Sequence, residues 1–170
     1  MTRQDFLIKW LVYALALIPV LILTLFVFPL IPIFGTVPAL LPVAAITVAV
    51  LEGPAGGAGF GLLVGILSDA LIPGIPGTMT FALSFLGACS GAAARYGVQQ
   101  NLAGCLICSG GSLALINLVR VIYLFLRGTA PFGPLLLTAV GEVFWSLVFL
   151  PLVYGIFLWV FHRVPKATVL

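Results

Sequence analysis

Four glycines and one aspartate recur at every fourth position of a single apolar stretch of the chain: Gly53, Gly57, Gly61, Gly65 and Asp69. Residues four apart lie on the same face of an α-helix, so this stretch predicts a helix with one smooth, small-residue face. In a membrane such a face allows another helix to approach closely, because lipid gives apolar helices no hydrophobic reason to associate. A carboxylate on that face is costly unless it points towards protein or water. The run therefore predicts a tightly packed, polar-lined interior within a membrane helix bundle.

Very few residues of the chain carry a charge. Of its 170 residues, 63% are hydrophobic and 6% are charged, and the mean hydropathy is +1.33. A soluble domain carries about 25% charged residues, so this chain cannot cover a surface that faces water. The formal net charge of +3 reflects a bias of basic residues towards one side of the membrane and indicates no nucleic-acid partner. We expect residues 1–170 to form one compact, all-α integral membrane domain whose surroundings are the lipid bilayer.

Prolines, glycines and short polar runs divide the chain into apolar segments of roughly bilayer length. A helix needs about 17–25 apolar residues to cross a membrane, and turn-rich clusters mark the segment ends. The pattern predicts six spans, at residues 10–28, 37–51, 56–72, 78–94, 102–126 and 135–161. The second and third are short, and a broken hairpin or re-entrant pair is the alternative for them.

The placement of lysine and arginine predicts the orientation of such a bundle. With six spans both termini lie on one side, which collects five basic residues: Arg3, Lys9, Arg95, Arg163 and Lys166. The opposite side has Arg127, with Arg120 near it. Because cytoplasmic loops are enriched in lysine and arginine, we expect a multi-pass protein with both termini in the cytoplasm.

Four polar residues within the spans are expected to lie at similar depth in the outer half of the bundle: Asp69, Asn117, Arg120 and Glu142. We expect Arg120 to pair with Glu142, because pairing reduces the cost of placing either charge in a membrane. One interpretation is that the cluster locks helix packing, and this is the favoured one. The other is a polar cavity for a ligand or partner.

Glu52 stands apart from this cluster, beside Gly53 and Pro54 at the inner boundary. We expect it to be a solvated residue at a helix end. A small ion or proton carrier that uses Glu52 and Asp69 is an alternative, but transporters usually combine such residues with internal repeats, and none is evident.

The sequence offers no catalytic, cofactor or metal site. Cys105 and Cys108 form a Cys-x-x-Cys pair within an apolar span, whereas thiolate chemistry needs a polar setting. No second pair or nearby histidine completes a zinc site. The single histidine, His162, is expected at the cytoplasmic interface. We expect the protein not to be an enzyme.

These residues resemble a known family. The pattern Gly57-x-Gly59-Phe60, followed by Gly65-Ile-Leu-Ser-Asp69 and Gly74-x-x-Gly77, is similar to the rod-shape-determining protein MreD family. The chain length, the six-span plan, the basic C-terminal tail and the start of the last span at Val143-Phe144-Trp145 are similar as well.

The resemblance implies a non-enzymatic component of the bacterial cell-elongation machinery in the cytoplasmic membrane. Such proteins bind the bitopic scaffold MreC and help connect MreB filaments with peptidoglycan synthases. The family's fold is similar to the substrate-binding subunits of energy-coupling-factor vitamin transporters. By this analogy the stretch from Gly57 to Asp69 and the turn at Gly74 and Gly77 shape a cavity and partner surface, while Gly87 and Gly91 serve helix contact.

The alternative function is that same transporter class, a vitamin-binding subunit that docks onto an energising module. Those subunits carry an Ala-x-x-x-Ala pattern in the first helix. Here the first span has Ala14 and Ala16 but no small residue four positions further on, which favours the elongation machinery.

Overall fold

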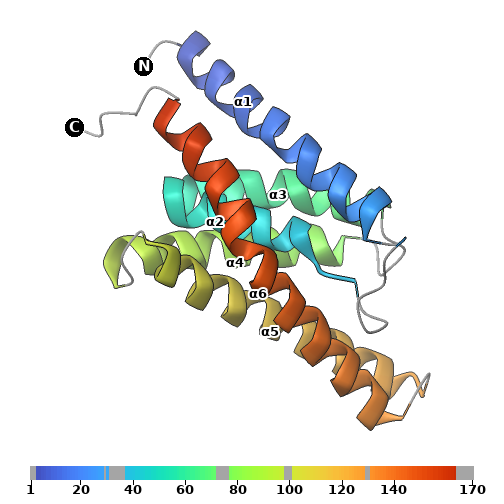
Figure 1. Ribbon diagram of the computed structural model, residues 1–170. Helices are drawn as coiled ribbons and strands as arrows, with labels where there is room; N and C mark the ends of the chain where they lie inside the picture. The colour runs from blue at the N-terminus through green and yellow to red at the C-terminus, as the bar shows by residue number, and fades with distance from the viewer. Residues whose placement is uncertain are drawn as a thin grey trace.

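The computed structural model describes residues 3–28, 30, 37–71, 77–97, 101–128 and 131–163, and in this part of the chain all regular structure is helical. Figure 1 shows the arrangement. The helices are α1 (Arg3–Ile22) with the short π-helix η1 (Leu23–Val27), α2 (Leu40–Glu52), α3 (Pro54–Leu71), α4 (Thr78–Tyr96), α5 (Leu102–Leu126) and α6 (Phe132–Arg163). Gly74, which the sequence places in a turn, lies outside the described residues.

The shortest α-helix, α2, forms the centre of the molecule (Figure 1). Twelve of its 13 residues are buried, from Leu40 to Leu51. It contacts α1, α3, α4, α5 and α6, and a helix that is apolar all round is stable only when covered on every side. At about 1.5 Å per residue, α2 is about 20 Å long, which is shorter than the roughly 30 Å hydrocarbon core of a bilayer.

In the described part of the chain, four helical segments are long and apolar enough to cross a membrane: Ile8–Val27, Pro54–Leu71, Leu102–Leu126 and Phe132–Arg163. The expectation of an all-helical chain suited to a membrane is therefore confirmed. The element bounds differ from the expected ones mainly at three places. The first helix begins at Arg3 instead of residue 10 and continues as a π-helix over Leu23–Val27. The second element begins at Leu40 instead of residue 37, and the last helix extends over 132–163 instead of 135–161.

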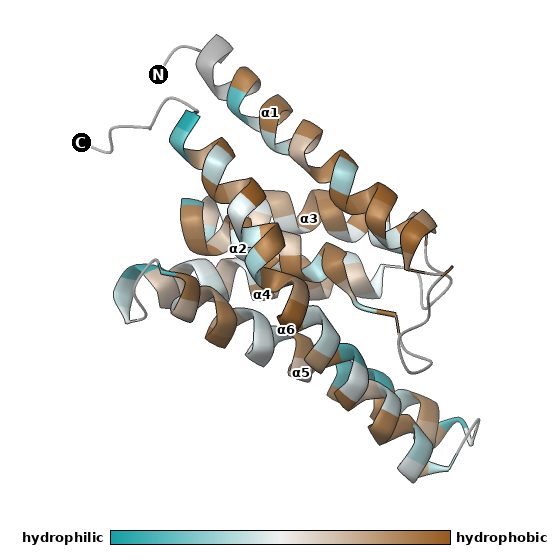
Figure 2. Ribbon diagram, in the orientation of Figure 1, coloured by the Kyte–Doolittle hydropathy of each residue, from teal (hydrophilic) through white to brown (hydrophobic). Residues whose placement is uncertain are grey.

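Hydrophobic residues, brown in Figure 2, predominate along α1 and α6. On α1, Leu11 and Leu15 are more than half exposed, and on α4 Phe81 is 76% exposed. Exposed leucine and phenylalanine in such numbers suit a surface that faces lipid chains. The first turns of α1 and the last turns of α6 lie at the same end of the molecule (Figure 1).

Candidate functional site

The helices α3 and α4 pack against each other through glycines, which we call the glycine seam: Gly57, Gly61 and Gly65 of α3 with Gly87 and Gly91 of α4. A Cβ atom added at Gly57 would lie 2.5 Å from the carbonyl oxygen of Gly87. One added at Gly91 would lie 2.5 Å from the carbonyl carbon of Gly53. Neither position has room for a methyl group, so the two backbones are in direct contact.

The seam is antiparallel and continues along the length of α3. Gly61 lies against the backbone of Leu83, and Gly65 against the backbone of Thr80. The hydroxyl of Ser84 also donates to the carbonyl oxygen of Ala58 at 3.3 Å. Each step of four residues along α3 thus brings the next glycine, about one helical turn further on, against the backbone of α4.

Asp69 lies at the end of this seam, where α4 begins. Its carboxylate accepts hydrogen bonds from the backbone N–H of Met79 at 3.2 Å and of Thr80 at 3.0 Å, and from the Thr80 hydroxyl at 2.6 Å. The N-cap residue of α4, Gly77, has φ of 81° and no side chain to perform this role. Asp69 therefore satisfies N–H groups that a helix start leaves free, at the end where the helix dipole favours negative charge.

This position of Asp69 corrects the expected four-residue cluster. The hydrogen bonds of its carboxylate go to the start of α4, so Asp69 does not join Arg120 and Glu142. The sequence shows how far along a helix a residue lies but not the direction in which its side chain points. Here the chain turns into α4 directly after α3, so the free N–H groups at the start of α4 lie within reach of the Asp69 carboxylate.

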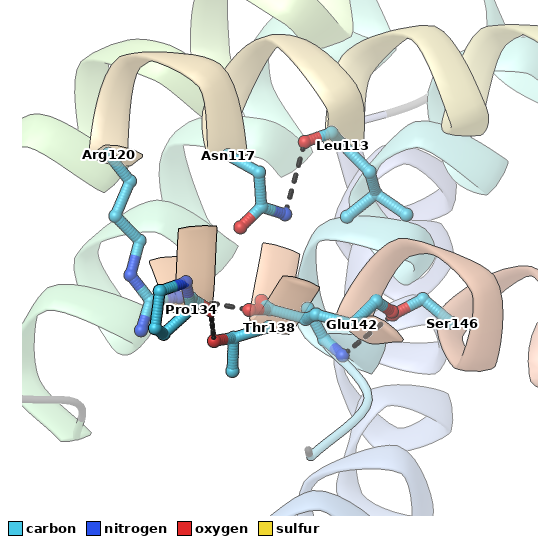
Figure 3. Close-up of polar contacts among 8 residues, drawn as sticks. Leu113, Asn117, Arg120, Pro134, Thr138, Glu142 and Ser146 are labelled. Atoms are coloured by element: carbon cyan, nitrogen blue, oxygen red, sulfur yellow. Dashed lines mark hydrogen bonds and ion pairs between the residues drawn. The ribbon is translucent and has the colours of Figure 1, made fainter. Parts of the chain in front are cut away.

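The expected pair of Arg120 and Glu142 is present between α5 and α6 (Figure 3). The guanidinium Nη1 of Arg120 donates to Glu142 Oε2 at 3.0 Å. The Arg120 side chain is 53% exposed and that of Glu142 18%. Asn117 is buried but donates its Nδ2 to the carbonyl oxygen of Leu113 at 3.2 Å, within α5. Of the four residues expected to meet, the structure joins two.

Ser146 connects the same part of α6 to the start of α2, which sequence reasoning missed. Its Oγ accepts a hydrogen bond from the backbone N–H of Ala39 at 2.8 Å and donates to the carbonyl oxygen of Glu142 at 2.6 Å. Figure 3 shows Ser146 one turn from Glu142. The side chain is fully buried, and its hydroxyl satisfies the backbone N–H of Ala39 at the partly buried beginning of α2.

Glu52 is not a solvated helix end, which corrects the sequence expectation. It forms an ion pair with Lys9, and the hydroxyl of Tyr13 donates to its Oε1 at 2.7 Å. The Lys9 and Glu52 side chains are only 10% and 11% exposed. Lys9 and Tyr13 lie one turn apart on α1, and this spacing is the signal that sequence reasoning did not use. The contact fixes the beginning of α1 to the end of α2.

The ring of Tyr13 extends this contact into an aromatic cluster. Its centroid lies 6.1 Å from that of Phe60 on α3 and 6.3 Å from that of Phe157 on α6. One end of the molecule thus joins α1, α2, α3 and α6 around a single ion pair.

The described residues bring no three His, Cys, Asp or Glu side chains together in a way that suits a metal ion. Cys105 is buried, with its Sγ 3.4 Å from the Thr47 hydroxyl. Cys89, Cys105 and Cys108 are free thiols. Cys105 thus packs between α5 and α2, whereas Cys89 on α4 is exposed.

No family model matches the chain, and no curated protein or solved structure does. The arrangement of the described residues is therefore the basis for a function. It comprises a glycine-packed hairpin closed by Asp69, a buried ion pair at one end and a partly exposed ion pair between α5 and α6. This arrangement suits rigid helix–helix association.

Proposed function

We propose that this chain is a non-enzymatic, partner-binding component of the bacterial cell-elongation machinery, similar to the MreD family. It sits in the cytoplasmic membrane with six inserted helices and both termini in the cytoplasm. Its fold is similar to the substrate-binding subunits of energy-coupling-factor transporters. It binds an MreC-like bitopic scaffold and so helps position wall synthases and MreB filaments.

The observation that carries the proposal is the hairpin of α3 and α4. The residues on which the family resemblance rests, from Gly57 to Asp69 and Gly77, lie in one structural unit, in which Asp69 caps the helix that follows Gly77. The stretch that carries the resemblance thus forms one packed unit with a cap at its end, and this supports the proposal.

The contacts made by the carboxylates of Glu52 and Asp69 support a partner-binding role over a role as an ion carrier. Glu52 is paired with Lys9 and bonded to Tyr13, and Asp69 is held by the start of α4. A coupling carboxylate must exchange its ion or proton during transport, whereas these two make several contacts that stabilise helix ends.

Affinity purification in mild detergent tests the proposal. The tagged chain is purified from its own host, and its partners are identified by mass spectrometry. We expect a bitopic scaffold together with wall synthases. Recovery of paired ATPases with a transmembrane coupling subunit would instead assign the chain to the vitamin transporters.

A matched variant makes this test specific. Gly61→Ala opens the glycine seam, whereas Gly59→Ala adds the same methyl on the same helix where nothing lies within 4 Å. We expect partner recovery to fall for Gly61→Ala and to stay unchanged for Gly59→Ala. Depletion of the chain is expected to turn rod-shaped cells round, and only the Gly59→Ala variant should restore rods fully.

A further inference from the structure

The hairpin of α3 and α4 has polar groups at its two ends and no charged residue between them. At one end the Asp69 carboxylate accepts hydrogen bonds from the start of α4, and Thr78, the first residue of that helix, is exposed. At the other end Arg95 and Tyr96 are exposed. The exposed large side chains between these ends are all apolar: Leu62, Leu63, Ile66, Phe81 and Phe85. In a membrane the two ends are therefore the levels at which the hairpin meets water.

The distance between these two levels is short for a bilayer. On α3 the helix rises about 22 Å from Pro54 to Asp69 at 1.5 Å per residue, and on α4 it rises about as far from Thr80 to Arg95. The hydrocarbon core of a typical bilayer is about 30 Å thick. The hairpin is therefore too short by about 8 Å, and any tilt of its helices would increase the shortfall.

The Asp69 end of the hairpin cannot reach further towards water by moving a side chain. An arginine near a helix end can extend to the interface, but Asp69 has a short side chain that is held by the backbone N–H groups of Met79 and Thr80. The glycine seam also fixes the two helices in register, because Gly61 and Gly65 contact backbone atoms of α4. The lipid must therefore adjust to the hairpin.

The opposite side of the molecule has length to spare. The helices α5 and α6 have 25 and 32 residues, which extend about 38 and 48 Å. Figure 1 shows α6 crossing α2, α3 and α4 obliquely, and tilting lets a long helix fit a thinner hydrocarbon core. The shortfall is therefore a property of the side formed by α3 and α4.

We propose that the α3–α4 hairpin thins the bilayer beside it and gathers phospholipids with short acyl chains at its exposed face. This goes beyond the proposed function, since it needs only that the chain lies in a membrane. A lipid whose chains match the hairpin avoids the free-energy cost of mismatch, whereas a lipid with long chains must compress them there. The ligand of this face is thus defined by the length of its acyl chains.

Tryptophan fluorescence in mixed vesicles tests this preference. The native Trp10, Trp145 and Trp159 are replaced by phenylalanine, and Phe85→Trp on α4 or Phe144→Trp on α6 then adds one tryptophan at a site that is 60% or 61% exposed. The vesicles contain equal amounts of dimyristoleoyl (short) and dierucoyl (long) phosphatidylcholine, and one of the two carries bromine at its double bonds as a quencher. We expect the short lipid to be enriched about threefold beside Phe85→Trp and not beside Phe144→Trp.

Three results of this comparison would overturn the proposal. The first is the same lipid composition beside both variants, and the second is enrichment of the long lipid beside Phe85→Trp. The third is equal enrichment of the short lipid at both positions, because the whole protein and not the hairpin would then thin the bilayer. Recovery of a protein partner plays no part in this test, so its outcome is separate from that of the proposed function.

Thiol labelling measures the thickness at the hairpin without changing any tryptophan. Thr78→Cys and Tyr96→Cys place thiols about 27 Å apart along α4, and the native Cys89 between them is exposed on the same helix. In nanodiscs of dierucoyl phosphatidylcholine, whose hydrocarbon core is thick and whose two faces are open, we expect a charged maleimide to modify both new thiols and to leave Cys89 unmodified. Mass spectrometry of the intact protein locates the label.

Either of two labelling results would contradict a thinned bilayer. An unmodified thiol in Thr78→Cys would place the start of α4 within the hydrocarbon core. Modification of Cys89 in the parent would show that water and not lipid covers the exposed face of the hairpin.

Discussion

The carboxylate of Asp69 on α3 accepts two hydrogen bonds from Thr80 on α4, one from its backbone N–H at 3.0 Å and one from its hydroxyl at 2.6 Å. A residue of one helix thus acts as the N-terminal cap of the next. The contact closes the hairpin at the end opposite to Gly53, where the backbone turns with φ of 91°.

Asp69→Ala removes this cap. We expect the free energy of unfolding in detergent to fall by about 1–2 kcal/mol, the cost of losing a capping side chain, which lowers the melting temperature by about 2–8 °C. Thr80→Ser keeps the hydroxyl and should have little effect. Equal melting temperatures for Asp69→Ala and the parent would contradict the capping role.

Gly61→Ala tests the glycine seam. The added methyl meets the backbone of Leu83, which cannot move aside as a flexible side chain does, so we expect a loss of about 1–3 kcal/mol, typical of overpacking. Gly59→Ala on the same helix enters open space and should be neutral or slightly stabilising, since alanine favours helix over glycine by about 1 kcal/mol. Thermal unfolding of the two variants side by side measures the difference.

Lys9→Met leaves the carboxylate of Glu52 mostly buried without its counter-ion. Breaking a buried ion pair on one side costs about 3–5 kcal/mol, and we expect a loss in this range for Lys9→Met. Adding Glu52→Gln to this variant should recover part of the loss, because no unpaired charge remains. Arg95→Met at the exposed end of α4 is the control. A loss that is the same with and without Glu52→Gln would contradict a direct ion pair.

The pair of Arg120 and Glu142 should contribute less, because Arg120 is half exposed. Coupling energies of polar contacts between membrane helices average about 0.6 kcal/mol. A double-mutant cycle with Arg120→Glu and Glu142→Arg should give a coupling of this size, with the swapped pair more stable than either single variant. Failure of the swap to rescue either single variant would argue against the pair.

Two buried serines should respond in opposite ways to replacement by alanine. Ser146 serves the N–H of Ala39, so Ser146→Ala leaves a partly buried donor without its partner and should cost about 1–3 kcal/mol. The hydroxyl of Ser68 is buried with no hydrogen-bond partner in the described part of the chain. Ser68→Ala should therefore be neutral or stabilising. The melting temperatures of the two variants, measured in the same detergent, decide this.

Periodicity predicted the parts of this structure that depend on neighbours along one helix. The four-residue spacing of Gly57, Gly61 and Gly65 predicted a smooth face, and that face forms the seam with α4. The cost of a lone charge in a membrane predicted the pair of Arg120 and Glu142, which the structure contains.

The sequence could not predict contacts that depend on the rotation of helices about their axes. Asp69 was expected to meet Arg120 and Glu142, but the direction of its side chain brings its carboxylate to Thr80. Lys9 was counted only as a basic residue near the terminus, although it pairs with Glu52, which is 43 residues away in sequence. The central place of α2 was also hidden, because an apolar helix looks the same in sequence whether protein or lipid covers it.

The shortness of α2 has a consequence for how the protein is made. A segment of 13 residues is too short to span the bilayer, so it cannot insert stably by itself when it leaves the insertion machinery. Most of its buried surface is covered by helices that the ribosome synthesises later, α3 to α6. The chain therefore reaches its final form only after α6 has emerged, and products that end before α6 should be recognised by quality-control proteases and degraded.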